Sequence, residues 1–299
     1  MTDTTASLRQ KISRAQDLQS VVRTMKGLAA SSVGQYERSV SALGEYRRAV
    51  ELGLSACFRR SEAAAPVVED RASGAIGAVV FGSDQGLVGQ FNEVVAEHAL
   101  KTLATRLGQP RIWAVGERVH ARLADAGLPV LKLFSVPNSV NAIAPLVGRI
   151  LLESEMPDRN GEVAELYLFY NRPSAGAAYA PVGQRLLPLD GGWRRERSEF
   201  PWPTKNLPEV MGDPAATLGA LIREYLFISL FRACAESLAS ENASRLAAMQ
   251  RAEKNIDELL TSLHDTFHRL RQSTIDEELF DLVAGFEALS KREEHRSGD

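Results

Sequence analysis

The distribution of proline constrains the fold of this chain more than any other feature of its sequence. All 13 prolines lie between Pro66 and Pro214, and residues 1–65 and 215–299 contain none. Because a proline inside a helix costs about 3 kcal/mol, two proline-free segments of this length favour two long helices. The divisions expected are an N-terminal helix, a mixed α/β domain, a C-terminal helix with a protruding tip, and a flexible tail: 1–65, 66–214, 215–290 and 291–299.

Both terminal segments repeat large or small apolar residues at intervals of seven. In the first segment these residues are Leu8, Ala15, Val22, Ala29, Tyr36, Leu43 and Val50. In the last segment the same interval holds Leu221, Ile228, Ala235, Asn242, Met249, Ile256, Leu263 and Leu270. Other apolar residues, Leu18 and Tyr46 among them, stand between these positions and complete the seam. A pattern kept over seven or eight heptads predicts a coiled coil. Asn242 either fixes the register from inside the seam or turns outward, and the sequence leaves both open.

The middle segment alternates between strand and helix patterns. Short apolar runs predict strands at 75–83, 111–116, 165–171 and 183–189. Amphipathic patterns between them predict helices at 91–108, 117–127 and 140–154. This alternation indicates a βαβ arrangement with a parallel sheet. The fold class is therefore α/β: a long antiparallel coiled coil of the terminal helices plus a Rossmann-like α/β domain.

If the two terminal helices pair, they pair antiparallel, because both join the middle domain at their inner ends. The positions of these ends predict which residues of the two helices face each other. Facing residue numbers should then add up to about 273, to within a helical turn. The last helix outruns the first by about 20 Å, since each residue adds 1.5 Å. The overhang carries an apolar stripe of Ile275, Leu279, Leu282, Val283, Phe286 and Leu289. An apolar face without a partner in its own chain indicates burial in another protein.

Small residues are concentrated where 239–252 should face 21–34. Two small-residue faces would allow the helix axes to approach closely, which predicts a narrow shaft with Arg245 pointing out of it. The two segments also differ in charge: residues 1–65 hold 10 Lys and Arg against 6 Asp and Glu, whereas 215–299 hold 10 against 15. Segments of opposite sign attract, which supports the pairing.

Composition excludes several classes of protein. A net charge of −3 gives no reason to expect a nucleic-acid partner. No run approaches the roughly 18 apolar residues of a membrane span, and the first residues lack the apolar core of a signal peptide, so we expect membrane contact only through partner proteins. Cys57 and Cys234 are far apart and are expected to be reduced thiols.

Two patterns raise the question of a chemical site. The stretch "FGSDQGLVGQFN" (81–92) follows a strand, as phosphate-binding loops do. Its glycines match neither of the two common spacings of such loops, G-x-G-x-x-G and G-x-x-x-x-G-K-S/T. We therefore expect a tight turn in which Ser83 or Asp84 caps the next helix. His264 and His268 have the spacing of a helical metal pair but no third ligand, so surface histidines are expected. We therefore expect no catalytic, cofactor or metal site.

Four motifs together resemble the gamma subunit of F-type ATP synthases. These are "MKGLAAS" (25–31), "SDQGLVGQFN" (83–92), "ESLASENASRLAAMQRAEKN" (236–255) and "RQSTIDEEL" (271–279) followed by "LVAGFEAL" (282–289). The third is long and specific. Gly27, Ser32, Gln85 and Asp276 depart from the family pattern, which suggests a divergent bacterial branch, with the sodium-type rotary ATPases as one candidate.

The resemblance implies a central rotor shaft that couples ion translocation to ATP synthesis or hydrolysis. The implied partners are the alpha and beta subunits, the epsilon subunit and the c-subunit ring, at the cytoplasmic face of the bacterial inner membrane. The resemblance also implies shaft contacts with alpha and beta subunits at Arg23, Met25, Arg245 and Gln272, and a bearing at the apolar tip. The alternative is a nucleotide-binding Rossmann-like module with coiled-coil arms for oligomerisation.

Overall fold

A computed structural model describes residues 4–60, 75–106, 110–155, 163–174, 177–206 and 209–296. Side chains in the last helix are described as far as Gly285. The chain divides into two compact units, which we describe one at a time. Unit 1 consists of Met1–Gly27 and Met249–Asp299, and unit 2 of Leu28–Ala248.

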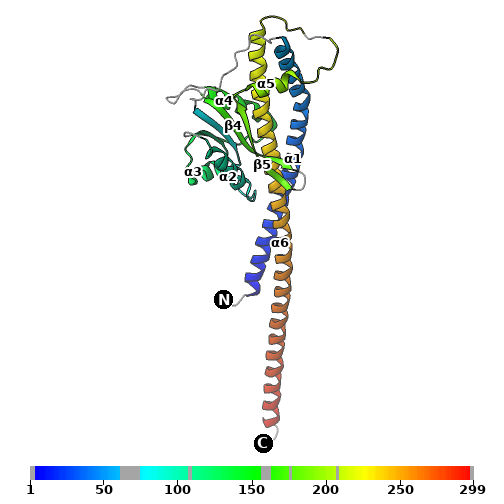
Figure 1. Cartoon of the computed structure of the whole chain (residues 1–299). Helices are drawn as coiled ribbons and strands as arrows, with labels where there is room; N and C mark the ends of the chain where they lie inside the picture. Colours follow the sequence, from blue (N-terminus) through cyan, green and yellow to red (C-terminus); the bar gives the residue numbers. More distant parts are fainter. Residues whose placement is uncertain are drawn as a thin grey trace. The chain divides into compact units, whose positions relative to one another are not determined.

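Helices and strands are numbered along the chain, which Figure 1 colours from blue at the N-terminus to red at the C-terminus. The helices are α1 (Thr5–Arg60), α2 (Phe91–Leu103), α3 (Glu117–Asp125), the 3-10 turn η1 (Val140–Ala142), α4 (Ile143–Glu155), α5 (Gly191–Ser198) and α6 (Pro214–Arg296). The strands are β1 (Ala75–Phe81), β2 (Arg111–Val115), β3 (Val130–Phe134), β4 (Val163–Ser174) and β5 (Ala177–Leu187).

Helix α6 begins where the sequence stops containing proline. Pro214 takes the first helical position, where its missing N–H is no loss. The Asp213 carboxylate accepts hydrogen bonds from the N–H groups of Ala215 (3.1 Å) and Ala216 (3.2 Å), which caps the helix. The helix continues to Arg296, past the boundary expected at residue 290, so most of the expected tail at 291–299 is helical. The last three residues of that tail lie outside the described part of the chain.

The heptad positions of α1 are largely the buried ones. Leu8, Ala15, Val22, Ala29, Tyr36 and Val50 are each at most 7% exposed. The positions between them are less regular: Leu18 is 54% and Tyr46 47% exposed, so the prediction that both complete the seam is wrong. The Tyr46 hydroxyl instead donates to Glu224 at 2.8 Å. On α6, Ile228, Ala235, Met249 and Ile256 are buried.

Unit 2 contains a five-stranded sheet in the order β3-β2-β1-β4-β5. The first four strands are parallel, as expected from the βαβ pattern. Strand β5 pairs antiparallel with β4, so a purely parallel sheet was a wrong expectation. Pro181 lies in β5, where the lack of an N–H is tolerated because the strand is at the edge of the sheet.

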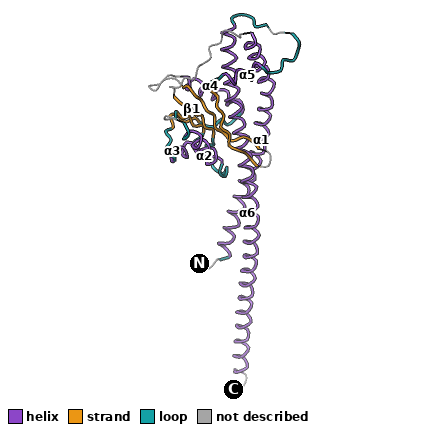
Figure 2. Tube along the Cα trace, viewed as in Figure 1, coloured by secondary structure: helices purple, strands orange, loops and turns teal. Residues whose placement is uncertain are grey.

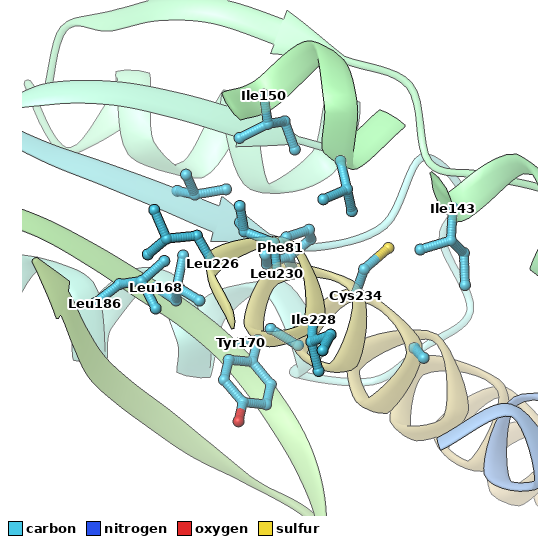
Figure 3. Close-up of a cluster of buried hydrophobic side chains, with 14 of the residues drawn as sticks. Phe81, Ile143, Ile150, Leu168, Tyr170, Leu186, Leu226, Ile228, Leu230 and Cys234 are labelled. Atoms are coloured by element: carbon cyan, nitrogen blue, oxygen red, sulfur yellow. The ribbon is translucent and has the colours of Figure 1, made fainter. Parts of the chain in front are cut away.

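Alternating residues of the strands face two different cores. On one face, Val80 and Ala114 pack with Val95 and Val119, which come from α2 and α3. On the other face, the core includes residues of α1, α4 and α6. Helices therefore cover both sides of the strands, which Figure 2 colours orange. Figure 3 shows the second core, where Leu226, Leu230 and Cys234 of α6 lie among Phe81, Leu168 and Leu186 of the sheet.

Candidate functional site

Three pairs of residues fix the register of the two helices in unit 1. Gln19 donates a hydrogen bond to Asp257, Arg23 pairs with Glu253, and the guanidinium of Arg9 lies 5.4 Å from the Phe267 ring centre. The residue numbers of each pair add up to 276. The helices are therefore antiparallel here, and the expected value of about 273 is correct to within one turn.

Of the expected shaft contacts, Arg23 and Met25 lie in this helix pair. The Arg23 guanidinium is 58% exposed and contacts the Glu253 carboxylate at 2.9 Å. Lys26, which the sequence did not single out, contacts the other oxygen of Glu253 at 2.5 Å. The hydrogen bonds from Lys26 and then Arg23 hold the pKa of Glu253 below its ordinary value. Met25 is half-buried.

The C-terminal part of α6 extends beyond the start of α1. Because α1 begins at Thr5, the register leaves α6 without an α1 partner from about residue 272 onward. The remaining 25 residues or so, as far as Arg296, span about 37 Å, which is longer than the expected 20 Å. Figure 1 shows this end of α6, in red, running past the first turns of α1.

The described part of the overhang exposes its apolar side chains. Ile275 is 49%, Leu279 58%, Leu282 73% and Val283 50% exposed, and Phe280, which was not in the predicted stripe, is 72% exposed. Gln272 is also exposed. The side chains of Phe286 and Leu289 lie outside the described residues. An unpaired helix with this much apolar exposure is a candidate protein interface.

The loop after β1 ties three strand ends together. The Asp84 carboxylate accepts a hydrogen bond from the N–H of Glu117, the first residue of α3, at 3.0 Å. Its second oxygen accepts from the N–H of Val136, just after β3, at 2.9 Å. Asp84 therefore caps α3 and not α2, so the expected cap of the next helix was wrong. Ser83 also leaves α2 uncapped, since it exchanges two 2.9 Å hydrogen bonds with the side chain of Asn92.

Gly116 lets this loop approach the end of β2. Its φ is +116°, and a Cβ there would lie 2.8 Å from the backbone of Ser83. Only glycine avoids both the strain and the collision. The glycine at the end of this predicted strand therefore permits a close backbone contact.

In unit 2, α6 presses its small residues against this loop. Ser244 Oγ donates to the Val88 carbonyl at 2.6 Å, and Ser240 is fully buried. The small residues of α1 behave differently: Ala30 and Ser31 are exposed, and a Cβ at Gly34 would meet only the Arg38 side chain, at 3.5 Å. In unit 1, a Cβ at Gly27 would meet nothing within 4 Å among the described residues. Gly27 and Gly34 are therefore not in close contact with α6, whereas Ala29, at a heptad position, is buried.

Arg245 lies in a cavity of about 200 Å³ beside α6. Its guanidinium is only 12% exposed and contacts the Glu241 carboxylate at 2.6 Å. It also donates to the Asn242 side-chain oxygen at 3.3 Å, while the Asn242 amide donates to the Leu238 carbonyl at 2.8 Å. Arg245 therefore points inward, contrary to the expectation that it projects from the shaft.

The other walls of this cavity are mostly polar. Asp84 lines it together with Ser32, Tyr36, Gln85, Val136, Pro137 and Asn138. Burial raises the pKa of Glu241, against the lowering effect of Arg245. Sequence reasoning missed Glu241, although its four-residue spacing from Arg245 on one helix predicts the pair.

The two histidines of α6 are exposed. The rings of His264 and His268 stack at 6.5 Å on the helix surface, as the outward heptad positions predicted. Among the described residues, no group of three or more His, Cys, Asp or Glu side chains could hold a metal ion. Over the same part of the chain, no helix has the length and apolar character of a membrane span.

Comparison with known proteins gives one consistent result. The family model described as ATP synthase matches residues 4–289. The chain is 30% identical to the ATP synthase gamma chain of Sorangium cellulosum, covering 95% of this chain and 98% of that protein. It is 28% identical to the ATP synthase gamma chain of Glaesserella parasuis, covering 94% and 98%. It is 29% identical to that of a Nostoc species, covering 95% and 98%.

Solved structures share the fold. The chain resembles a chain of the Euglena gracilis mitochondrial ATP synthase rotor with a TM-score of 0.58 and 15% identity, covering 91% of this chain and 98% of that one. It resembles a chain of the Tetrahymena thermophila ATP synthase central stalk and c-ring with a TM-score of 0.54 and 19% identity, covering 78% and 99%.

Proposed function

Because this chain belongs to the F-type ATP synthase gamma-chain family, we propose that it acts as the rotating central shaft of such a complex. The shaft would couple ion translocation through a c-subunit ring to ATP synthesis or hydrolysis in a hexamer of alpha and beta subunits. It would have no catalytic site of its own, and it would reach the membrane only through its partners, at the cytoplasmic face of the inner membrane.

The observation that carries this proposal is the unpaired end of α6. Ile275, Leu279, Leu282 and Val283 are all about half exposed or more on a helix that has no α1 partner at that level. Burying a leucine side chain contributes about 1.5–3 kcal/mol, so these side chains favour a protein socket over water. An apolar ring formed by the alpha and beta subunits around this tip would give a low-friction bearing without a fixed polar contact.

The residues proposed to contact the alpha and beta subunits differ in how exposed they are. Arg23 and Gln272 are exposed, and Arg23 is already oriented by Glu253. Met25 is half-buried and offers a flexible apolar contact. Arg245 is buried against Glu241, so a contact with a catalytic subunit requires its guanidinium to exchange that carboxylate for another.

The alternative function, a nucleotide-binding module, is not favoured. The loop after β1 uses its polar groups within the fold: Ser83 bonds to Asn92, and Asp84 bonds to two backbone N–H groups. In the neighbouring cavity Arg245 is already paired with Glu241, and the Asp84 carboxylate adds a negative charge that repels phosphate.

Rotation itself provides the direct test. Cys57 and Cys234 are buried, so an introduced Asp125→Cys thiol on the exposed end of α3 can be labelled selectively. The labelled chain is assembled with alpha and beta subunits from the same source, and the hexamer is fixed to a surface. We expect the label to turn in steps when ATP is added. ATP hydrolysis by the assembly with a stationary label would refute the shaft function.

The bearing is tested by a matched pair of variants. Leu279→Ser with Leu282→Ser removes two side chains of the stripe, whereas Phe280→Ser removes a larger apolar group that is equally exposed but lies on another side of the helix. Assembly with alpha and beta subunits should weaken in the double variant and change little in Phe280→Ser. Equal weakening in both would show that general apolarity, not the stripe, holds the tip.

A further inference from the structure

Unit 2 contains a second polar cavity, on the side of α6 that faces β4 and β5. Its volume is about 90 Å³. Side chains from five elements line it: Arg47 and Glu51 of α1, Tyr170 and Arg172 of β4, Gln184 of β5, Arg197 of α5, and Tyr225, Ile228, Ser229 and Arg232 of α6. Segments that are far apart in the sequence therefore supply one compact polar site.

The lining carries an excess of positive charge. Four arginines meet three glutamates: Glu51 in the lining, Glu236 just behind it, and the exposed Glu196, which contacts Arg197 at 2.6 Å. Glu236 is bracketed by Arg172 at 2.8 Å and Arg232 at 2.6 Å, and its carboxylate is 7% exposed. Because Arg172 and Arg232 share the single carboxylate of Glu236, one positive charge is left in excess, which favours a bound anion.

Aromatic rings hold one of these arginines in place. The Arg197 guanidinium lies 5.1 Å from the Trp193 ring centre and 5.4 Å from that of Tyr225, and it is only 14% exposed. Its terminal nitrogens also donate to the Glu196 carboxylate at 2.6 Å and to the Tyr225 hydroxyl at 3.4 Å. A guanidinium fixed in this way loses little freedom when it binds a ligand.

Several donors of the cavity are unused. Within the described residues Arg232 bonds through Nε alone, so its two terminal nitrogens donate no hydrogen bond. Arg47 has only a 3.6 Å ion-pair contact with Glu51. Arg47 and Arg232 are 44% and 36% exposed, so their free N–H groups lie at the open side of the cavity. The site can therefore be reached from solvent.

We propose that this cavity binds a phosphate-type dianion, either inorganic phosphate or the phosphate group of a small monoester. The cavity has room for one tetrahedral oxyanion, whose negative charge offsets the positive excess of the wall. Arginine forks match phosphate oxygens with paired hydrogen bonds. A bound dianion would join α1, α6 and the α/β domain of unit 2. This inference does not depend on the proposed function.

Calorimetric titration of the purified full chain with inorganic phosphate tests the site, at constant ionic strength set with sodium chloride. We expect a saturable heat with one phosphate per chain. Arg232→Gln and Arg47→Gln should each weaken binding about tenfold, which equals about 1.4 kcal/mol. The control is Arg223→Gln, an exposed arginine on the same helix outside the cavity, which should bind like the unchanged chain.

Arg232→Gln could also disturb the fold, because Arg232 contacts Glu236, whereas Arg47 lies on an open helix surface. The two variants are therefore tested side by side, and circular dichroism checks that each is folded. A parallel titration with glycerol phosphate distinguishes the source: tighter binding than phosphate identifies a monoester site, and weaker binding a site for free phosphate. The proposal is overturned if neither compound gives a saturable heat, or if Arg223→Gln loses as much affinity as Arg232→Gln and Arg47→Gln.

Discussion

Replacing Asp84 by alanine should destabilise unit 2 more than any other single change at an acidic residue on its surface. The carboxylate joins the loop after β1 to the first turn of α3 and to the segment after β3, through the N–H groups of Glu117 (3.0 Å) and Val136 (2.9 Å). Within the described part of the chain neither N–H has another acceptor, so both lose their partner in Asp84→Ala.

The size of the effect follows from these two hydrogen bonds. A hydrogen bond to a charged group contributes about 1.5–3 kcal/mol. Asp84 is half-exposed, so water can replace part of the loss, and we take the lower end of the range for each bond. Asp84→Ala should therefore cost about 3 kcal/mol of unfolding free energy. Asp84→Asn keeps one acceptor oxygen and should cost about half as much.

Urea unfolding of the full chain, followed by tryptophan fluorescence, measures this cost. Trp113 is fully buried in β2 and reports on the sheet. The control is Asp125→Ala, because Asp125 is exposed at the end of α3 and accepts no hydrogen bond within the described residues. If the unfolding midpoints of Asp84→Ala and Asp125→Ala coincide, the carboxylate does not hold the three strand ends together.

Two further predictions concern ionisable groups. Lys26 and Arg23 lower the pKa of Glu253 in the folded chain. The ionised carboxylate therefore stabilises the fold above the ordinary pKa of about 4.3, and this stabilisation is lost as the pH falls through the lowered pKa. The melting temperature should change less between pH 6 and pH 3 in Glu253→Gln than in the control Glu258→Gln. Burial raises the pKa of both Cys57 and Cys234, so a thiol reagent at pH 8 should label neither thiol until urea unfolds the chain, and fast labelling of either would contradict the packing.

The long helices and the first strands could be predicted because their signals are local. Proline is excluded from helix interiors whatever surrounds them, and the heptad pattern reports the buried side directly. Strand β3 was missed because its sequence, "VLKLF", alternates poorly and its middle residues are exposed. Helix α5 was missed because its sequence, "GGWRRERS", has no apolar face.

The direction of β5 depends on where that strand begins. The apolar run at 183–189 suggested a late start, which leaves room for a crossover to a parallel strand. In the structure β5 begins at Ala177, and only two residues separate it from the end of β4 at Ser174. A connection this short permits only an antiparallel pair. A shift of six residues in one boundary therefore reversed the expected strand direction.

The chemistry of the candidate sites was harder to predict because it is not local. The contacts of Asp84 with Glu117 and Val136 join residues 33 and 52 positions apart. The four arginines of the phosphate cavity come from α1, β4, α5 and α6. No spacing within one element brings these groups together, so only the folded chain reveals them.

The last prediction concerns the small residues of α1. Two interpretations of these residues predict changes of opposite sign in the melting temperature of Gly27→Ala. If they let α1 and α6 pack closely, Gly27→Ala introduces a collision and lowers the melting temperature. In the structure a Cβ at Gly27 meets no described atom within 4 Å, so the change should stabilise an exposed helix by about 0.5–1 kcal/mol. The control is Gly53→Ala, whose Cβ would lie 3.0 Å from the Leu221 side chain and should gain less. A lower melting temperature for Gly27→Ala than for the unchanged chain, measured by circular dichroism, would restore the close-packed shaft; a higher one means that Gly27 lies on the side of α1 that faces away from α6.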